Sequence, residues 1–351
     1  MQTHLIIAIL FVITLILSYI EDYLKDIHKA VILTGYVTFM ILLATTKSVE
    51  HTADALSYET MFYHNDNVLN EIATEPTFIY LSKLILACEG TIGTMFFIYA
   101  IITIPLKVFA LSKMTPYIFS ALLIYIPIYF EVQDMIQIRA AAAATFLLSS
   151  ILPLSRKQYL LSAILMICGI FFHYSAVAYL PFLLIGNRRL NQTWRIIIAC
   201  VLPILIIMYL FKKDFLSLLP SDWLGGKIEF YKKTTEKGEW GSGFSPFYMV
   251  YIWIKCIMLF LCLYYYKYIT EKSPLTPILI NLFIASIFVI LVFSSIPIIS
   301  GRIGELYGII DCIVFTFCML VIQPKYMAKT SIALIGLYML LHNIFFTEYF
   351  T

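Results

Sequence analysis

The sequence predicts an all-α integral membrane protein, a polytopic bundle of about 11–12 transmembrane helices in a single domain over residues 1–351. Of its 351 residues, 61% are hydrophobic and only 13% are charged, whereas soluble domains are about 25% charged and 45–50% apolar. This composition excludes a soluble globule, a disordered chain and a secreted disulfide scaffold. The formal net charge of only +3 gives no reason to expect a nucleic-acid partner.

Apolar runs of a length suited to spanning follow one another along the chain, since a membrane helix needs about 20 mostly apolar residues. The first run has no basic residue before it and no small-residue cleavage site, so we expect a retained helix and not a signal peptide. Residues 76–88 are apolar but too few to span, and we expect a short interfacial or re-entrant helix there. The expected spans are 3–20, 28–46, 91–111, 116–132, 137–153, 158–174, 176–186 (short), 196–211, 247–268, 275–298, 303–322 and 330–347.

Seven cysteines lie in these apolar runs without ligand-like spacing, and we interpret them as small buried hydrophobes. No cluster of carboxylates has the arrangement that a hard cation requires. We therefore expect neither a metal nor another cofactor.

Lysine and arginine in the short loops indicate the orientation of the chain. An external N-terminus places 13 basic residues, Lys107 and Arg195 among them, and only four acidic ones on the inside. Two long external loops follow, 47–75 with six acids and 212–246 with Trp223 and Trp240. These tryptophans fit either an interfacial belt or platforms on which sugars stack.

Ionisable residues within the apolar runs are candidates for function, because they are costly in a bilayer. Arg139 opens a helix that descends for about 22 Å to a turn near residue 154, and the next helix returns for about 28 Å to His173. Both side chains are therefore expected at the external face of one helical hairpin. Taken alone, the arginine could simply snorkel and the histidine could be an ordinary interfacial residue.

Arg302 and Glu305 open a later descending helix at the same face, where they could instead form a simple i,i+3 pair. Two guanidinium groups near one histidine would suit a phosphate or diphosphate and a proton transfer. Asp54 shares a helix face with Tyr58, and this face could present a carboxylate over the cavity or lie on the membrane surface.

Lys255 and Asp311 lie at matching depths, about 12 and 13 Å into their helices. We predict that they pair within the bundle, directly or through one polar neighbour. The alternative is that each snorkels or meets water separately.

In its short motifs the chain resembles the EpsG/Wzy group of bacterial polysaccharide polymerases. The motifs recur in the family order over about residues 50–310. They are T-A-D-A-L-S-Y (52–58), E-P-T-F (75–78), Arg139 before a small-residue helix, F-H-Y-S-A (172–176), and Arg302 with Tyr307.

The resemblance implies a GT-C-like glycosyltransferase of the bacterial cytoplasmic membrane, with its active site facing outward. It would join undecaprenyl-diphosphate-linked repeat units, with membrane lipids around it and with a flippase and a chain-length regulator as possible pathway partners. The implied catalytic residues are Arg139, His173 and Arg302, with Asp54 or Glu305 as the base, and the implied substrate-binding residues are Tyr58, Glu75, Tyr174, Tyr307, Trp223 and Trp240.

Three other functions remain open at this point. A flippase would carry ionisable residues through both leaflets, and a membrane O-acyltransferase would need its histidine accessible from the cytoplasm. An O-antigen ligase would use the same lipid-diphosphate donor with a different acceptor.

Overall fold

The regular elements of the computed structural model are helices, in agreement with the predicted all-α class. The structure describes residues 2–47, 52, 54–64, 74–211, 246–294 and 297–346. The expected loop 212–246 lies almost entirely outside the described residues. The chain divides into two compact units, Met1–Leu180 with Asp311–Thr351 (unit 1) and Pro181–Ile310 (unit 2). The expected single domain stays a prediction.

Unit 1 holds the N-terminal helices and the C-terminal ones. Its elements are α1 (Gln2–Ile20), α2 (Asp26–Thr45), α3 (Ala55–Tyr63), α5 (Pro76–Ala87), α6 (Ile92–Met114), α7 (Ile118–Tyr125), the π-helix η1 (Ile126–Asp134), α8 (Ile138–Ser155), α9 (Tyr159–Phe172), the 3-10 helix η2 (Tyr174–Tyr179), α17 (Asp311–Val314), the 3-10 helix η5 (Phe315–Phe317), α18 (Cys318–Val321) and α19 (Lys325–Phe346).

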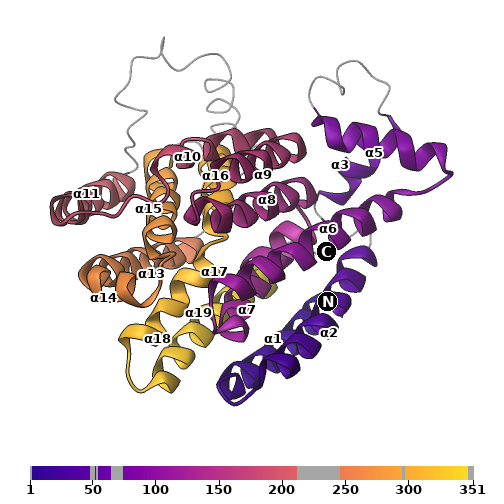
Figure 1. Ribbon diagram of the computed structural model, residues 1–351. Helices are drawn as coiled ribbons and strands as arrows, with labels where there is room; N and C mark the ends of the chain where they lie inside the picture. Colours follow the sequence, from indigo (N-terminus) through magenta and orange to yellow (C-terminus); the bar gives the residue numbers. More distant parts are fainter. Residues whose placement is uncertain are drawn as a thin grey trace, which may run out of the picture. The chain divides into compact units, whose positions relative to one another are not determined.

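Helices α8 and α9 form the predicted hairpin (Figure 1). The run Ala140–Ala144 presents small side chains, and four of its five residues are buried completely. Gly169 of α9 lies so close to α8 that an added Cβ would be 3.3 Å from the Ala143 carbonyl oxygen. Lys157, with a φ of 61°, turns the chain from one helix into the other. Small residues therefore bring the two backbones together, as is common between membrane helices.

Unit 2 consists of α10 (Phe182–Ile185), α11 (Gln192–Leu210), α13 (Pro246–Tyr264), α14 (Tyr266–Lys272), α15 (Thr276–Val292) and α16 (Pro297–Gly308). Helices α13 and α14 are separated by a bend of 80°. Lys255 of α13 donates to Ser286 of α15 at 2.6 Å, and this hydroxyl donates to the Gly304 carbonyl of α16 at 3.2 Å. Asn281 fixes the start of the unit by donating to the carbonyls of Gly186 and Arg188.

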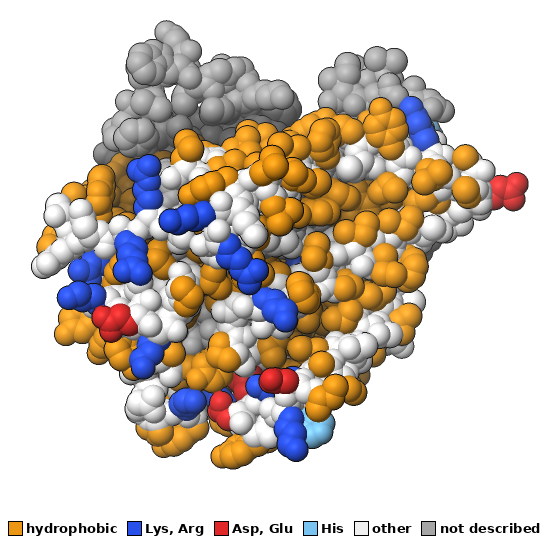
Figure 2. All heavy atoms as spheres, viewed as in Figure 1, with side chains coloured by type: hydrophobic (Ala, Val, Ile, Leu, Met, Phe, Trp, Pro, Cys, Tyr) orange, Lys and Arg blue, Asp and Glu red, His pale blue; other side chains and the backbone are white. Residues whose placement is uncertain are grey.

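The polytopic membrane class is confirmed. The described residues include six helices that are long and apolar enough to span a membrane, and two bent helix pairs raise this number to eight if each pair forms one span. Hydrophobic side chains also cover much of the visible surface (Figure 2). The described residues hold fewer full-length helices than the 11–12 expected for the whole chain. The run 116–132 is divided between α7 and η1, and 176–186 between η2 and α10, while α9 has only 14 residues.

Some basic residues of the orientation count have buried partners. Lys107, counted on the inside, lies within α6 with a completely buried side chain. Its ammonium is 3.0 Å from both carboxylate oxygens of Asp134, at the end of η1. The sequence alone does not show that a cation is buried in such a pair. A count of loop charges therefore includes it among the internal cations and overstates their number.

Candidate functional site

Three predicted residues of unit 1 meet at one carboxylate. Glu75 accepts a hydrogen bond from Arg139 through Oε2 at 2.5 Å, and its Oε1 lies 2.6 Å from His173 Nδ1. The side chains of Glu75, His173 and Arg139 expose only 4%, 15% and 17% of their surfaces. Arg139 is therefore part of a buried polar cluster and does not simply snorkel. We call these three residues the Glu75 triad.

Local sequence features place each member of the triad. Pro76 provides the first residue of α5, a position where its missing N–H costs nothing, and Glu75 lies just before it with extended backbone. Its carbonyl oxygen accepts from the Phe78 and Ile79 amides. His173 ends α9 with a φ of −158°, which directs the chain away from the helix axis. Thr77 donates to the Phe171 carbonyl at 2.7 Å and so joins the start of α5 to the end of α9.

An aromatic wall supports the arginine of the triad. The Arg139 guanidinium lies 5.2 Å from the ring centre of Tyr58 and 5.7 Å from that of Phe78, which are cation–π distances. Both rings belong to a buried cluster with Phe62 of α3 and Tyr99 of α6. The face of α3 that carries Tyr58 therefore packs against protein. The Nε of Arg139 is buried without a hydrogen-bond partner among the described residues.

Electrostatics keep the triad carboxylate ionised. Burial alone would raise the pKa of Glu75, but the hydrogen bond with His173 and the charge of Arg139 outweigh it, so the pKa lies below its usual value. Glu75 thus holds His173 through Nδ1, and no described residue bonds the other ring nitrogen. An imidazole oriented in this way can accept a proton at Nε2.

A second cation of unit 1 lies close to the same aromatic cluster. Lys47 donates to the Met135 carbonyl, and its Nζ is 4.1 Å from the ring centre of Phe96. Burial lowers the pKa of this lysine to about 7, although the charges of Asp54 and Asp134 oppose the shift. The charge of Lys47 near neutral pH therefore depends on its surroundings, whereas an exposed lysine stays protonated.

The remaining predicted residues differ in how far they are exposed. In unit 1, Asp54 is exposed just before α3, and Tyr174 of η2 is 47% exposed. In unit 2, Arg302 is exposed and Glu305 is half-buried, whereas Tyr307 is buried against Phe182. Trp223 and Trp240 lie outside the described residues. The predicted meeting of Arg302 with Arg139, and that of Lys255 with Asp311, involve both units and stay predictions.

Sequence reasoning missed the polar groups on η1. Asp134 accepts from Tyr125 at 2.7 Å as well as from Lys107, and Glu131 accepts from Asn343 of α19 at 2.9 Å. Tyr129 of the same π-helix donates to Asp311 at 2.9 Å. The signal was the presence of Glu131 and Asp134 three residues apart at the end of an apolar run. π-helical turns are rare and frequently mark functional sites.

Comparison with known families identifies the family of the chain. A family model, the EpsG family, matches residues 30–351 and so includes all three residues of the Glu75 triad. The chain belongs to the EpsG family. The resemblance seen in the short motifs is thereby confirmed, and membership of the EpsG family indicates a membrane protein of the polysaccharide-polymerase, glycosyltransferase-like type.

Other comparisons add nothing to this assignment, because neither a curated protein nor a solved structure matches this EpsG-family chain. Among the described residues, no group of three His, Cys, Asp or Glu side chains is arranged to hold a metal ion.

Proposed function

We propose that this protein joins lipid-diphosphate-linked oligosaccharide repeat units, undecaprenyl-diphosphate being the carrier, at the external face of the cytoplasmic membrane. The observation that supports it most is the Glu75 triad, in which a carboxylate orients a histidine and holds an arginine next to it. Family membership supports the polymerase class. The orientation count places 13 basic residues and only four acidic ones on the inside, which supports a site that faces outward.

In the proposed reaction, His173 acts as the general base. A hydroxyl oxygen of the acceptor unit attacks the anomeric carbon of the donor chain, and its proton passes to Nε2 of His173. The bond between the anomeric carbon and the diphosphate oxygen breaks, and the electron pair leaves with the lipid diphosphate. Glu75 stabilises the imidazolium that forms, as the carboxylate of a catalytic triad does. His173 takes the place of Asp54 and Glu305 as the proposed base, because a carboxylate holds its ring through Nδ1.

Arg139 stabilises the charge that develops on the departing diphosphate. Its unpartnered, buried Nε–H is a donor that a phosphate oxygen could satisfy, and an unsatisfied buried donor costs about 1–3 kcal/mol. Preorganised donors of this kind contribute most when charge develops away from water. Tyr58 and Phe78 hold the guanidinium plane in place during this step.

The experiment measures polymer formation from purified lipid-linked repeat units by the full-length protein in proteoliposomes. His173→Ala and Arg139→Ala should each lower the rate by at least about 100-fold, while Arg139→Lys should recover only part because an ammonium lacks the planar fork. Arg156→Ala, exposed at the other end of α8, and His28→Ala, exposed on α2, are matched controls that should leave the rate unchanged. Wild-type rates for both site variants would refute the proposal.

A deletion strain separates the alternative functions. Loss of a polymerase leaves single repeat units on the cell surface, loss of a flippase leaves no glycan, and loss of a ligase leaves polymer that is not attached. Only the first outcome agrees with the proposed function.

A further inference from the structure

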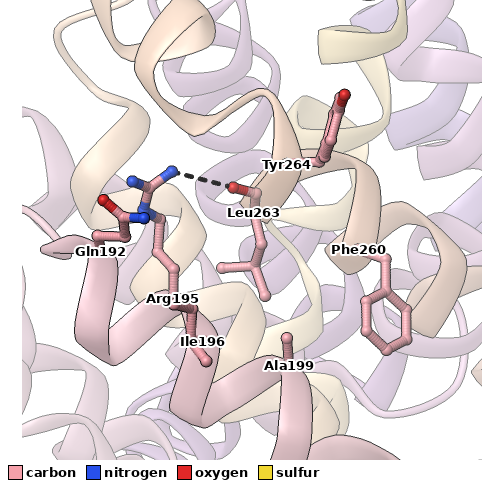
Figure 3. Close-up of a pocket in the computed structure, with 7 residues that line it drawn as sticks. All are labelled: Gln192, Arg195, Ile196, Ala199, Phe260, Leu263 and Tyr264. Atoms are coloured by element: carbon pink, nitrogen blue, oxygen red, sulfur yellow. Dashed lines mark hydrogen bonds between the residues drawn. The ribbon is translucent and has the colours of Figure 1, made fainter.

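A groove in unit 2 lies between the start of α11 and the end of α13 (Figure 3). Its volume is about 330 Å³. Arg195 and Gln192 form its polar end, three residues apart at the start of α11. The rest of the lining is apolar or aromatic and consists of Ile196, Ala199, Phe260, Leu263 and Tyr264.

Arg195 has unused capacity to bind an anion. One terminal nitrogen donates to the Leu263 carbonyl at 3.3 Å, and the guanidinium lies 5.5 Å from the ring centre of Tyr266. Its Nε is buried without a hydrogen-bond partner, and no described carboxylate pairs with this arginine. The N-terminus of the 19-residue helix α11 adds positive potential at the same place. The polar end of the groove thus suits a phosphate group.

The position of the groove points to a lipid as the source of this phosphate. Helix α11 has the length and hydropathy of a membrane span, and only 11% of its apolar window is buried in protein. The 80° bend after Tyr264 turns α14 away from the direction of α13, as a chain does where it leaves the bilayer. Lys267 and Lys272 on α14 add cations at this end. Basic pockets between helices at a membrane surface commonly bind anionic headgroups.

We propose that this groove binds an anionic phospholipid, with its phosphate on Arg195 and Gln192 and an acyl chain along Ile196, Ala199 and Phe260. A free phosphate ion would use only the polar end and would leave the apolar walls without a ligand. The site shares no residue with the Glu75 triad and does not require the proposed reaction.

The experiment is native mass spectrometry of the full-length protein in detergent, titrated with phosphatidylglycerol or with phosphatidylcholine of identical acyl chains. Phosphatidylglycerol should bind about fivefold more tightly, the preference that one basic residue gives at an anionic surface. Arg195→Gln should abolish this preference, and Arg195→Lys should retain part of it. Arg189→Gln is the matched control, since this exposed arginine lies just before α11 and does not line the groove.

A second variant tests the apolar part without removing a charge. Ala199→Phe should fill the groove and weaken phosphatidylglycerol binding while the protein stays folded, so the proposal can be tested even if the Arg195 variants do not fold. Equal binding of both lipids by the wild type, an unchanged preference in Arg195→Gln, or full competition by millimolar inorganic phosphate would each overturn the proposal.

Discussion

Replacing Glu75 by glutamine removes the charge that Arg139 and His173 share while keeping the size of the side chain. Removing one partner of a buried ion pair costs about 3–5 kcal/mol, because the remaining charge is left without compensation. Arg139 keeps its contacts with Tyr58 and Phe78 and is 17% exposed. The amide can also accept one of the two hydrogen bonds. We therefore expect the free energy of unfolding to fall by about 2–3 kcal/mol, and polymer formation to be lost.

The assay is equilibrium unfolding of the full-length protein in detergent micelles, with Glu89→Gln as the control at the exposed end of α5. The pKa of Glu75 is lowered in the folded state, so its stabilisation is complete above the unfolded value near 4.5 and declines as pH falls through the lower folded value. Titration of Glu75 itself should therefore add no pH dependence to the difference between wild type and Glu75→Gln above about pH 6.

A double-mutant cycle decides whether the loss comes from the ion pair. Arg139→Met should destabilise alone, and the double variant with Glu75→Gln should be more stable than the sum predicts by at least about 1 kcal/mol. Additive effects within about 0.5 kcal/mol would refute the reasoning, as would an unchanged stability and rate in Glu75→Gln.

Three further predictions test the packing and the buried charges. Gly336→Ala would place a Cβ 2.2 Å from the Leu123 carbonyl oxygen and should sharply lower the yield of folded protein, whereas Gly35→Ala enters open space and should not, by size-exclusion chromatography. Burial raises the pKa of Glu21 from 4.5 to about 7, so stability should fall as pH rises between these values, and Glu21→Gln should flatten this decline in thermal melts. Lys255→Met and Asp311→Asn should each reduce folded protein, and the double variant should recover part of it if the two residues pair; no recovery would contradict the pairing.

The class of the protein and the centre of its site could be predicted because both depend on local patterns. Apolar runs identify membrane helices, and the rise per residue of two consecutive helices brings Arg139 and His173 to one end of a hairpin. The role of Glu75 was harder to see. Its motif suggested substrate binding, but only the packing of α5 against α9 shows that its carboxylate faces both partners.

The polar groups of η1 were missed for a different reason. The expected span 116–132 assumed α-helical geometry throughout, with Glu131 on the ordinary 3.6-residue period, and it ended before Asp134. The π-helical turns change which way these side chains point, and the choice between α and π depends on long-range bonds such as Lys107 with Asp134. Such bonds join residues far apart in the sequence, so a local pattern cannot reveal them.

The shared carboxylate of Glu75 also couples two events that separate residues could perform independently. Its oxygens are 2.5 and 2.6 Å from their partners, so a shift of little more than 1 Å would take both contacts beyond ordinary hydrogen-bond length. A displacement of Glu75 would release the arginine and the histidine at the same moment, so that neither contact could be lost without the other.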